Sequence, residues 1–351
     1  MVKIPEQNSP TIAKLFAVYE AKKDEPREHL GASEIGRECD REIWLRWRHA
    51  LPPSFDGRMK RLFNTGTREE TRVISDLRAA GLEVCDFDSS GRQIRFEALA
   101  GMFGGSVDGM VRGLVECPEK WHVLEIKTHN EKSFRDLVSK GVEKSKPAHY
   151  AQMQVYMGLS EVDRAFCVAV NKNTDEIWGE RVRFEKKDFD SLMDRAEKII
   201  KRDSAPEKLS QDPSFWICKM CGFHGMCHGH TVAQVNCRTC VHGYANKGWR
   251  CGLVDDLTTK PCDQHLHNPD LMSLKKSDKR TEDMEAIFYE KDGKEIAEVS
   301  KGAQPTPGIP QYSSMELHEM SLSDDSWVAV GSEAHTKTRD YFGGRFTKNG
   351  E

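Results

Sequence analysis

The sequence predicts an α/β protein in which helices cover a central β-sheet, followed by a small cysteine-rich metal-binding lobe. Segments with helical periodicity alternate with short strand-like runs along the first two thirds of the chain. In the stretch VLEIKTH, Glu125 and Lys127 share one strand face, and Leu124 and Ile126 share the other. Apolar residues on both faces are typical of a strand covered on both sides. Seven of the eleven cysteines lie within residues 218–262, which predicts the metal-binding lobe.

The composition is that of a soluble globular protein of the cytoplasm. The 351 residues are 38% hydrophobic and 31% charged, with a net charge of −4. No apolar run is long enough to span a bilayer, and the N-terminal MVKIPEQNSP lacks the apolar core of a signal peptide. These features predict a cytoplasmic protein that does not enter a membrane.

The order of the elements predicts four segments. Residues 1–30 form an N-terminal lead-in with one short helix, and residues 31–230 form the main domain. This domain begins with helices, continues with the glycine-punctuated strands QIRFEAL and GGSVDGMVRGL, and ends with the amphipathic helix KKDFDSLMDRAEKIIKR. Residues 231–270 form the cysteine/histidine lobe. Residues 271–351 contain a hairpin, EAIFYEKDGKEIAEV, and a poorly ordered tail rich in Pro, Gly and Ser.

A basic stretch interleaved with aromatic residues lies near the start of the main domain. Such a stretch favours binding to a nucleic acid backbone, although a solvated helix face gives the same pattern. The acidic net charge excludes indiscriminate coating of DNA but not a local basic groove. The predicted DNA-binding residues are Arg41, Arg46, Arg48, Arg58, Lys60 and Arg61.

Two strand carboxylates predict a divalent metal site. Asp108 lies in GGSVDGMV, about one hairpin before Glu125, so the two strands are expected to be neighbours. Adjacent carboxylates repel each other unless a cation intervenes, and oxygen ligands favour Mg²⁺ or Mn²⁺. Lys127 would then help activate a water molecule or stabilise charge on a phosphate. Taken alone, an Asp beside glycines is more typical of a turn, and a Glu-x-Lys strand is more typical of a surface ion pair.

Two helices supply further candidates. Glu70 follows Gly66 by one turn on an apolar helix face, where the glycine is expected to allow close approach to the sheet, and helical phase favours Glu70 over Glu69. Gln152 and Tyr156 are also one turn apart and share a face. They are candidates for binding a phosphate or for holding the lysine.

This order of residues resembles the PD-(D/E)XK nuclease superfamily, and more closely its RecB-like exonuclease branch. The resemblance implies a restriction-endonuclease-like mixed sheet flanked by helices and metal-dependent hydrolysis of DNA, with the Ile126 carbonyl as a further metal ligand. Val107 departs from the proline of the superfamily motif. The matching residues are Glu70, Asp108, Glu125, Lys127, Gln152 and Tyr156.

The first cysteine set is ICKMCGFHGMC, which supplies three thiols and lacks a fourth ligand. From the residues alone, that ligand is His224, His228 or the distant Cys39. The chain is similar here to AddB and the CRISPR-adaptation exonucleases, and this resemblance implies a structural [4Fe–4S] cluster. Iron and zinc both accept four thiolates. The implied ligands are Cys39, Cys218, Cys221 and Cys227.

The second cysteine set predicts one Zn²⁺ ion in a zinc-ribbon-like lobe. A loose cysteine-rich linker is the alternative, and His265 is the substitute ligand. The isolated Cys85, Cys117 and Cys167 are expected to be buried packing residues. The predicted zinc ligands are Cys237, Cys240, Cys251 and Cys262.

Together these features predict a Mg²⁺- or Mn²⁺-dependent deoxyribonuclease. The resemblance favours an exonuclease over an endonuclease, with a role in DNA recombination, repair or phage DNA processing, in the host cytoplasm if the gene is a phage gene. No phosphate-binding helicase motif is present, so the chain is expected to act on DNA ends or single strands with a recombination or replication partner. Two alternatives are a non-catalytic DNA-binding or assembly module and a zinc-ribbon regulatory protein.

Overall fold

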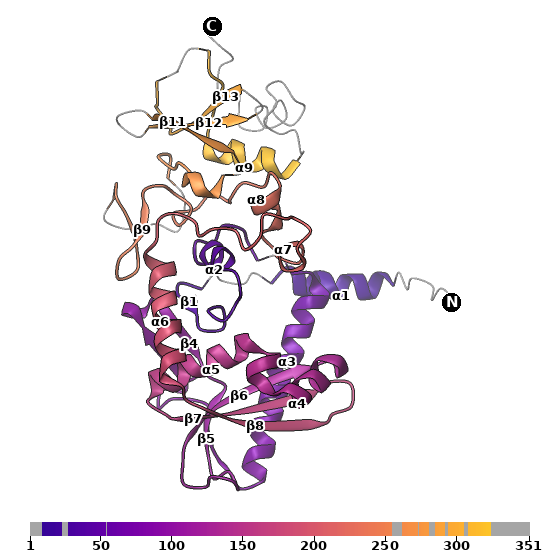
Figure 1. Ribbon diagram of the computed structural model, residues 1–351. Helices are drawn as coiled ribbons and strands as arrows, with labels where there is room; N and C mark the ends of the chain where they lie inside the picture. Colours follow the sequence, from indigo (N-terminus) through magenta and orange to yellow (C-terminus); the bar gives the residue numbers. More distant parts are fainter. Residues whose placement is uncertain are drawn as a thin grey trace. The chain divides into compact units, whose positions relative to one another are not determined.

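The computed structural model describes residues 9–22, 27–53, 55–254, 262–272, 274–280, 285–291, 294–304 and 308–323. The chain divides into two compact units (Figure 1). The first contains residues 1–37 and 53–197, and the second contains residues 38–52 and 198–351. This division differs from the predicted segments, because residues 38–52 leave the main domain and join the cysteine-rich part of the chain.

The first unit contains two mixed sheets and five helices, the last of which, α6, continues into the second unit. Its elements are α1 (Pro10–Glu20), β1 (Leu30–Gly31), α3 (Gly57–Ala79), β2 (Glu83–Cys85), β3 (Arg95–Ala98), the 3₁₀ turn η1 (Leu99–Gly101), β4 (Phe103–Ser106), β5 (Gly109–Arg112), β6 (His122–His129), α4 (Glu131–Ser145), α5 (Pro147–Ser160), β7 (Arg164–Asn171), β8 (Ile177–Arg183) and α6 (Lys186–Lys201).

The larger sheet has the strand order β2-β5-β6-β7-β8. Only β6 and β7 run parallel, and the other pairs are antiparallel. The second sheet has the order β1-β4-β3, in which β1 is parallel to β4. The predicted mixed sheet flanked by helices is therefore confirmed, as is the pairing of the strand that follows Asp108 with the strand that carries Glu125.

Strand β6 is covered on both faces, as its apolar pattern predicts. Leu124 and Ile126 pack in one core with Val73 and Ile74 of α3. The opposite face carries Glu125 and lies toward α4 and α5, which pack against β6 and β7 (Figure 1). Gly66 does not bring α3 close to the sheet as predicted, because a Cβ atom there would meet nothing within 4 Å.

The second unit contains short helices and two further sheets. Its elements are α2 (Asp40–Trp47), α7 (Trp216–Lys219), α8 (His224–His228), β9 (Gly243–Ala245), β10 (Trp249–Cys251), η2 (Pro269–Leu271), β11 (Lys275–Arg280), β12 (Ala286–Lys291), β13 (Lys294–Val299), β14 (Gln311–Tyr312) and α9 (Ser314–Ser323).

The predicted hairpin is β12–β13, within a sheet of order β11-β12-β13-β14. The prediction of a poorly ordered tail is wrong for residues 311–323, which form β14 and α9. They are ordered by burial, because Tyr312, Leu317 and Met320 join the core of this unit. The tail beyond residue 323 lies outside the described residues.

Candidate active site and metal centres

The first candidate site is built on β6, where Glu125 and Lys127 extend toward α5. The Glu125 side chain is fully buried (0% exposed). Apart from an ion pair with Lys127, neither of its oxygens has a hydrogen-bond donor within the described residues. A buried carboxylate without donors is costly, and native structures normally avoid it. Within the described residues, Glu125 therefore has Lys127 as its partner and no further hydrogen-bond donor.

Asp108 is held beside this pair by the backbone. It lies between β4 and β5, and its Oδ2 accepts a hydrogen bond from the Ile126 amide at 2.7 Å. The same oxygen lies 3.7 Å from Lys127 Nζ. Lys127 also donates to the Ile126 carbonyl oxygen at 3.2 Å. Strand pairing and this amide thus bring together Asp108, Glu125 and Lys127, as the sequence predicted.

Charge at this site is unbalanced toward the negative. Burial raises the pKa of Glu125 to about 7, Lys127 opposes the shift, and Asp108 and Glu70 add to it. Burial and Asp108 also raise the pKa of Glu70. Burial alone would lower the pKa of Lys127, but the carboxylates outweigh it and raise that pKa. Three carboxylates thus share one ammonium group.

The residues present fit a hard divalent cation. Oxygen donors are the ligands that Mg²⁺ and Mn²⁺ prefer. The Glu125 carboxylate, whose partner within the described residues is Lys127, interacts with the carboxylates of Asp108 and Glu70. The choice of Glu70 over Glu69 agrees with the structure, because Glu69 pairs with Arg72 at 3.3 Å while Glu70 interacts with Asp108 and Lys127.

Helix α5 packs against β6 and contributes further residues to the candidate site. The Tyr156 hydroxyl donates to the Ser106 carbonyl oxygen at 2.9 Å and also bonds to Gln152. Gly105 makes this contact possible, since a Cβ atom there would lie 2.6 Å from the Tyr156 hydroxyl oxygen. Tyr156 and Gln152 are both buried. They therefore brace the segment that carries Asp108.

Two histidines that the sequence analysis missed extend the site. His129 follows Glu125 and Lys127 at the strand period of two, and His149 precedes Gln152 by one helical turn. Their ring centroids lie 6.0 Å apart. His129 Nε2 and His149 Nδ1 are both buried without a hydrogen-bond partner. The two periodicities could have identified both residues.

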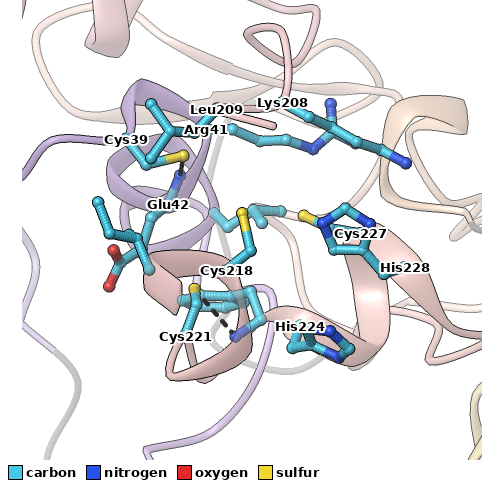
Figure 2. Close-up of a pocket in the computed structure, with 13 residues that line it drawn as sticks. Cys39, Arg41, Glu42, Lys208, Leu209, Cys218, Cys221, His224, Cys227 and His228 are labelled. Carbon is cyan, nitrogen blue, oxygen red and sulfur yellow. Dashed lines mark hydrogen bonds between the residues drawn. The ribbon is translucent and has the colours of Figure 1, made fainter. Parts of the chain in front are cut away.

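The first cysteine set forms a pocket within the second unit. Cys39, Cys218, Cys221 and Cys227 all line it, and Figure 2 shows their sulfur atoms facing its interior. The pocket holds about 380 Å³ of empty space, part of it open to solvent. Burial raises the pKa of Cys221 to about 11 and also raises that of Cys227, so the thiolates need a cationic partner.

Within the described residues, no three cysteine sulfurs lie within 4.8 Å of one another. Four thiolates are a donor set that both zinc and an iron–sulfur cluster accept. The histidine alternatives, His224 and His228, line the same pocket.

The second cysteine set also lies in the second unit. Cys237 and Cys240 each lie close enough to Cys251 and Cys262 for their charges to interact. Gly243 follows this C-x2-C turn so tightly that a Cβ atom would meet the Cys237 carbonyl oxygen at 2.2 Å. The residue types fit zinc, while the described sulfur positions are more widely spaced than a bound ion requires. Of the isolated cysteines, Cys167 is buried as expected, but Cys85 is exposed and Cys117 is half-buried.

The substitute ligand His265 belongs to a different cluster. Its Nδ1 lies 2.8 Å from Ser314 Oγ and its Nε2 lies 3.1 Å from the Asn236 carbonyl oxygen. Nearby, His267 Nδ1 lies 2.7 Å from Glu298 Oε1, and all three side chains are buried. Although His265, His267 and Glu298 could together hold a metal ion, these contacts already satisfy their polar atoms.

The basic stretch is divided between the two units. In the second unit, Arg41 donates to the backbone of Pro206 and Asp270, and Arg46 pairs with Glu42. Arg48 is 2% exposed, and its guanidinium stacks on Trp44 and Trp249. These arginines are engaged in packing. Arg58, Lys60 and Arg61 lie in the first unit, at the start of α3.

Comparison with known proteins identifies only distant structural likenesses. No family model matches the sequence, and no curated protein matches it. The chain is similar to the alkaline exonuclease LHK-Exo from Laribacter hongkongensis in its complex with dAMP, at 18% identity and a TM-score of 0.37 over 53% of this chain and 90% of that chain. It is also similar to a phage-related exonuclease from Haemophilus somnus, at 17% identity and a TM-score of 0.32 over 46% and 77% of the two chains. Within the described residues, no helix is long and apolar enough to cross a membrane.

Proposed function

We propose that the protein is a divalent-metal-dependent DNA nuclease, with exonuclease activity favoured by its resemblance to the RecB-like branch. The observation that carries this proposal is the fully buried Glu125 carboxylate beside Asp108 and Glu70, which has Lys127 as its one ion-pair partner within the described residues. Buried charge of this kind is stabilised by a bound cation. Recombination, repair and phage DNA processing are the roles proposed for it.

Asp108 and Glu125 would hold Mg²⁺ or Mn²⁺, with Glu70 and the Ile126 carbonyl completing the ligand set. When bound, the metal neutralises charge on the phosphate and lowers the pKa of a bound water. Lys127 lies beside both strand carboxylates. From that position it would help orient or activate the water, or stabilise charge on the phosphate. Gln152 and Tyr156 keep the Asp108 segment in place.

The two cysteine sets are proposed as separate metal centres. Cys39, Cys218, Cys221 and Cys227 would hold a [4Fe–4S] cluster with a structural role, and Cys237, Cys240, Cys251 and Cys262 would hold Zn²⁺. Iron, acid-labile sulfide and zinc contents of protein purified without oxygen test both assignments. Cys39→Ser should abolish the iron while leaving the zinc, and Cys251→Ser should do the reverse.

DNA is the proposed partner, and the exposed Arg58 and Arg61, with Lys60, are the candidates for backbone contacts on α3. The activity is tested with end-labelled linear DNA and covalently closed circles, in Mn²⁺ or in EDTA. An exonuclease degrades only the linear form, and Lys127→Ala and EDTA both abolish cleavage. No cleavage by folded, metal-loaded protein would favour a non-catalytic DNA-binding module instead.

A further inference from the structure

Two neutral histidines continue the candidate active site along β6. Glu125, Lys127 and His129 point to the same side of the strand, since each is two residues after the last. His149 faces His129 from the first turn of α5. Burial lowers the pKa of His129 to about 4 and that of His149 to about 3, with nearby lysines contributing, so both rings are neutral.

Each ring presents an unused nitrogen. His129 Nδ1 lies 3.0 Å from Ser133 Oγ, and a Ser133 hydroxyl that donates to it leaves the ring hydrogen on Nε2. That Nε2 is buried and has no partner, and the side chain as a whole is 93% buried, with 7% exposed. Within the described residues, His149 Nδ1 is also buried without a partner. Two buried, unpartnered nitrogens on rings whose centroids lie 6.0 Å apart favour a polar ligand for this pair.

Lysine ammonium groups act on both rings, although Lys127 is itself paired with Glu125. Lys127 and Lys146 both act on His129 and His149, and Lys172 acts on His129. Lys146 has one carboxylate neighbour, Asp136, at 3.4 Å. The N-terminus of the 14-residue helix α5 adds partial positive charge at His149. Such surroundings disfavour a second metal ion and favour an anion.

We propose that His129 Nε2 and His149 Nδ1 bind a phosphate of the nucleic acid backbone adjacent to the phosphate that is cleaved. This inference rests on the proposed nuclease function and adds a substrate subsite to it. His129 lies two strand residues beyond Lys127, a distance of roughly 6.6 Å. That distance is comparable to the spacing of successive phosphates along an extended strand.

Histidine resonances of the metal-free full chain provide a direct test. Inorganic phosphate is titrated into ¹⁵N-histidine-labelled protein, and the ring nitrogens of His129 and His149 should shift. His122 is the internal control, because it is also buried with an unpartnered Nε2 but lies at the other end of β6 on the opposite face. No shift at His129 and His149, or an equal shift at all three residues, would overturn the proposal.

Substitution of each histidine by asparagine or glutamine tests which ring nitrogen donates to the phosphate. Glutamine places an amide nitrogen near the position of Nε2, and asparagine places one near Nδ1. His129→Leu and His149→Leu should each raise the KM for linear DNA roughly tenfold. His129→Gln and His149→Asn should restore most of the loss, whereas His129→Asn and His149→Gln should not. Equal effects of all amide variants would assign the pair a packing role.

The two proposals fail separately. If the wild-type protein cleaves no DNA but phosphate still shifts the two histidines, the anion subsite stands and the nuclease proposal fails. If DNA cleavage is normal and the leucine variants leave KM unchanged, the nuclease proposal stands and the subsite fails.

Discussion

Glu125 in the first unit and Glu298 in the second are both completely buried, but their surroundings treat the carboxylate in opposite ways. Glu298 accepts hydrogen bonds from the amide and ring of His267, from Ser314 and from Tyr289. Among the described residues, Glu125 has the ion pair with Lys127 and no further donor. The structure therefore supplies the hydrogen bonds of Glu298 internally, and Glu125 is the carboxylate proposed to bind a cation. Burial alone does not distinguish a structural acid from a functional one, but the supply of donors does.

The partners of Glu298 explain why it is structural. The Nδ1 of His267 lies 2.7 Å from the carboxylate, and its Nε2 lies 2.9 Å from the Ala233 carbonyl oxygen. Burial alone would raise the pKa of Glu298, but His267 and Ser314 outweigh burial and lower it to about 2. This pair joins β13 to the segment that follows the second cysteine set.

The largest expected effect is on stability. Glu298→Ala should lower the free energy of unfolding of the second unit by about 3–5 kcal/mol, because it removes the buried partner of His267 Nδ1 and of the Ser314 hydroxyl. Urea denaturation, followed by hydrogen exchange of β12 and β13, measures this loss. Glu125→Gln is the comparison variant and should not destabilise the metal-free protein, because it removes a buried charge that burial itself disfavours. Equal destabilisation by both would remove the distinction between the two carboxylates.

The pH dependence of stability should have opposite sign at the two glutamates. The lowered pKa of Glu298 contributes stability above pH 4.5 that is lost as the pH falls toward 2. The raised pKa of Glu125 contributes stability below pH 4.5 that is lost as the pH rises through 7. Each change is at most about 3.4 kcal/mol, since each pKa differs from 4.5 by about 2.5 units and one unit is worth 1.36 kcal/mol.

The free energy of unfolding is measured in EDTA at each pH for the wild type, Glu298→Gln and Glu125→Gln. The difference between the wild type and each variant gives the contribution of that glutamate. Differences that rise with pH for both residues would contradict the expected sign for Glu125.

DNA cleavage, unlike stability, should depend on Glu125. Glu125→Gln should reduce DNA cleavage by at least about 100-fold, the scale of losing a charge-stabilising group from an active site. Single-turnover rates in Mn²⁺ measure the loss. Cys85→Ser is a control on the same sheet, because Cys85 is exposed and lies outside the site. Unimpaired cleavage by Glu125→Gln would refute its role as a metal ligand.

The smallest effect concerns metal binding without catalysis. Mn²⁺ at ten times its Kd should stabilise the wild-type protein by about 1.4 kcal/mol. Asp108→Asn should abolish this stabilisation, whereas Glu298 variants, measured at a temperature where they remain folded, should keep it. Thermal unfolding with and without Mn²⁺ provides the measurement. A gain that persists in Asp108→Asn would place the bound metal elsewhere.

Much of the first site was predictable because its signals are local. Glu125 and Lys127 stand on a strand whose apolar pattern demands burial, and Gln152 and Tyr156 repeat at helical spacing. The same local rules failed for Arg48. Its charge predicted a DNA contact, but stacking on Trp44 and Trp249 buries it, and burial lowers its pKa to about 10.

By itself, the sequence determined the mixed sheet, the charged face of β6 and the grouping of the cysteines, because strand period, helical period and ligand spacing act over a few residues. Only the tertiary structure decided which buried acid is satisfied. His267, Glu298 and Ser314 come from three separate segments, and His129 meets His149 only after α5 packs on β6. Hydrogen-bond donors and electrostatic shifts depend on distance in space, and no local pattern of residues encodes that distance.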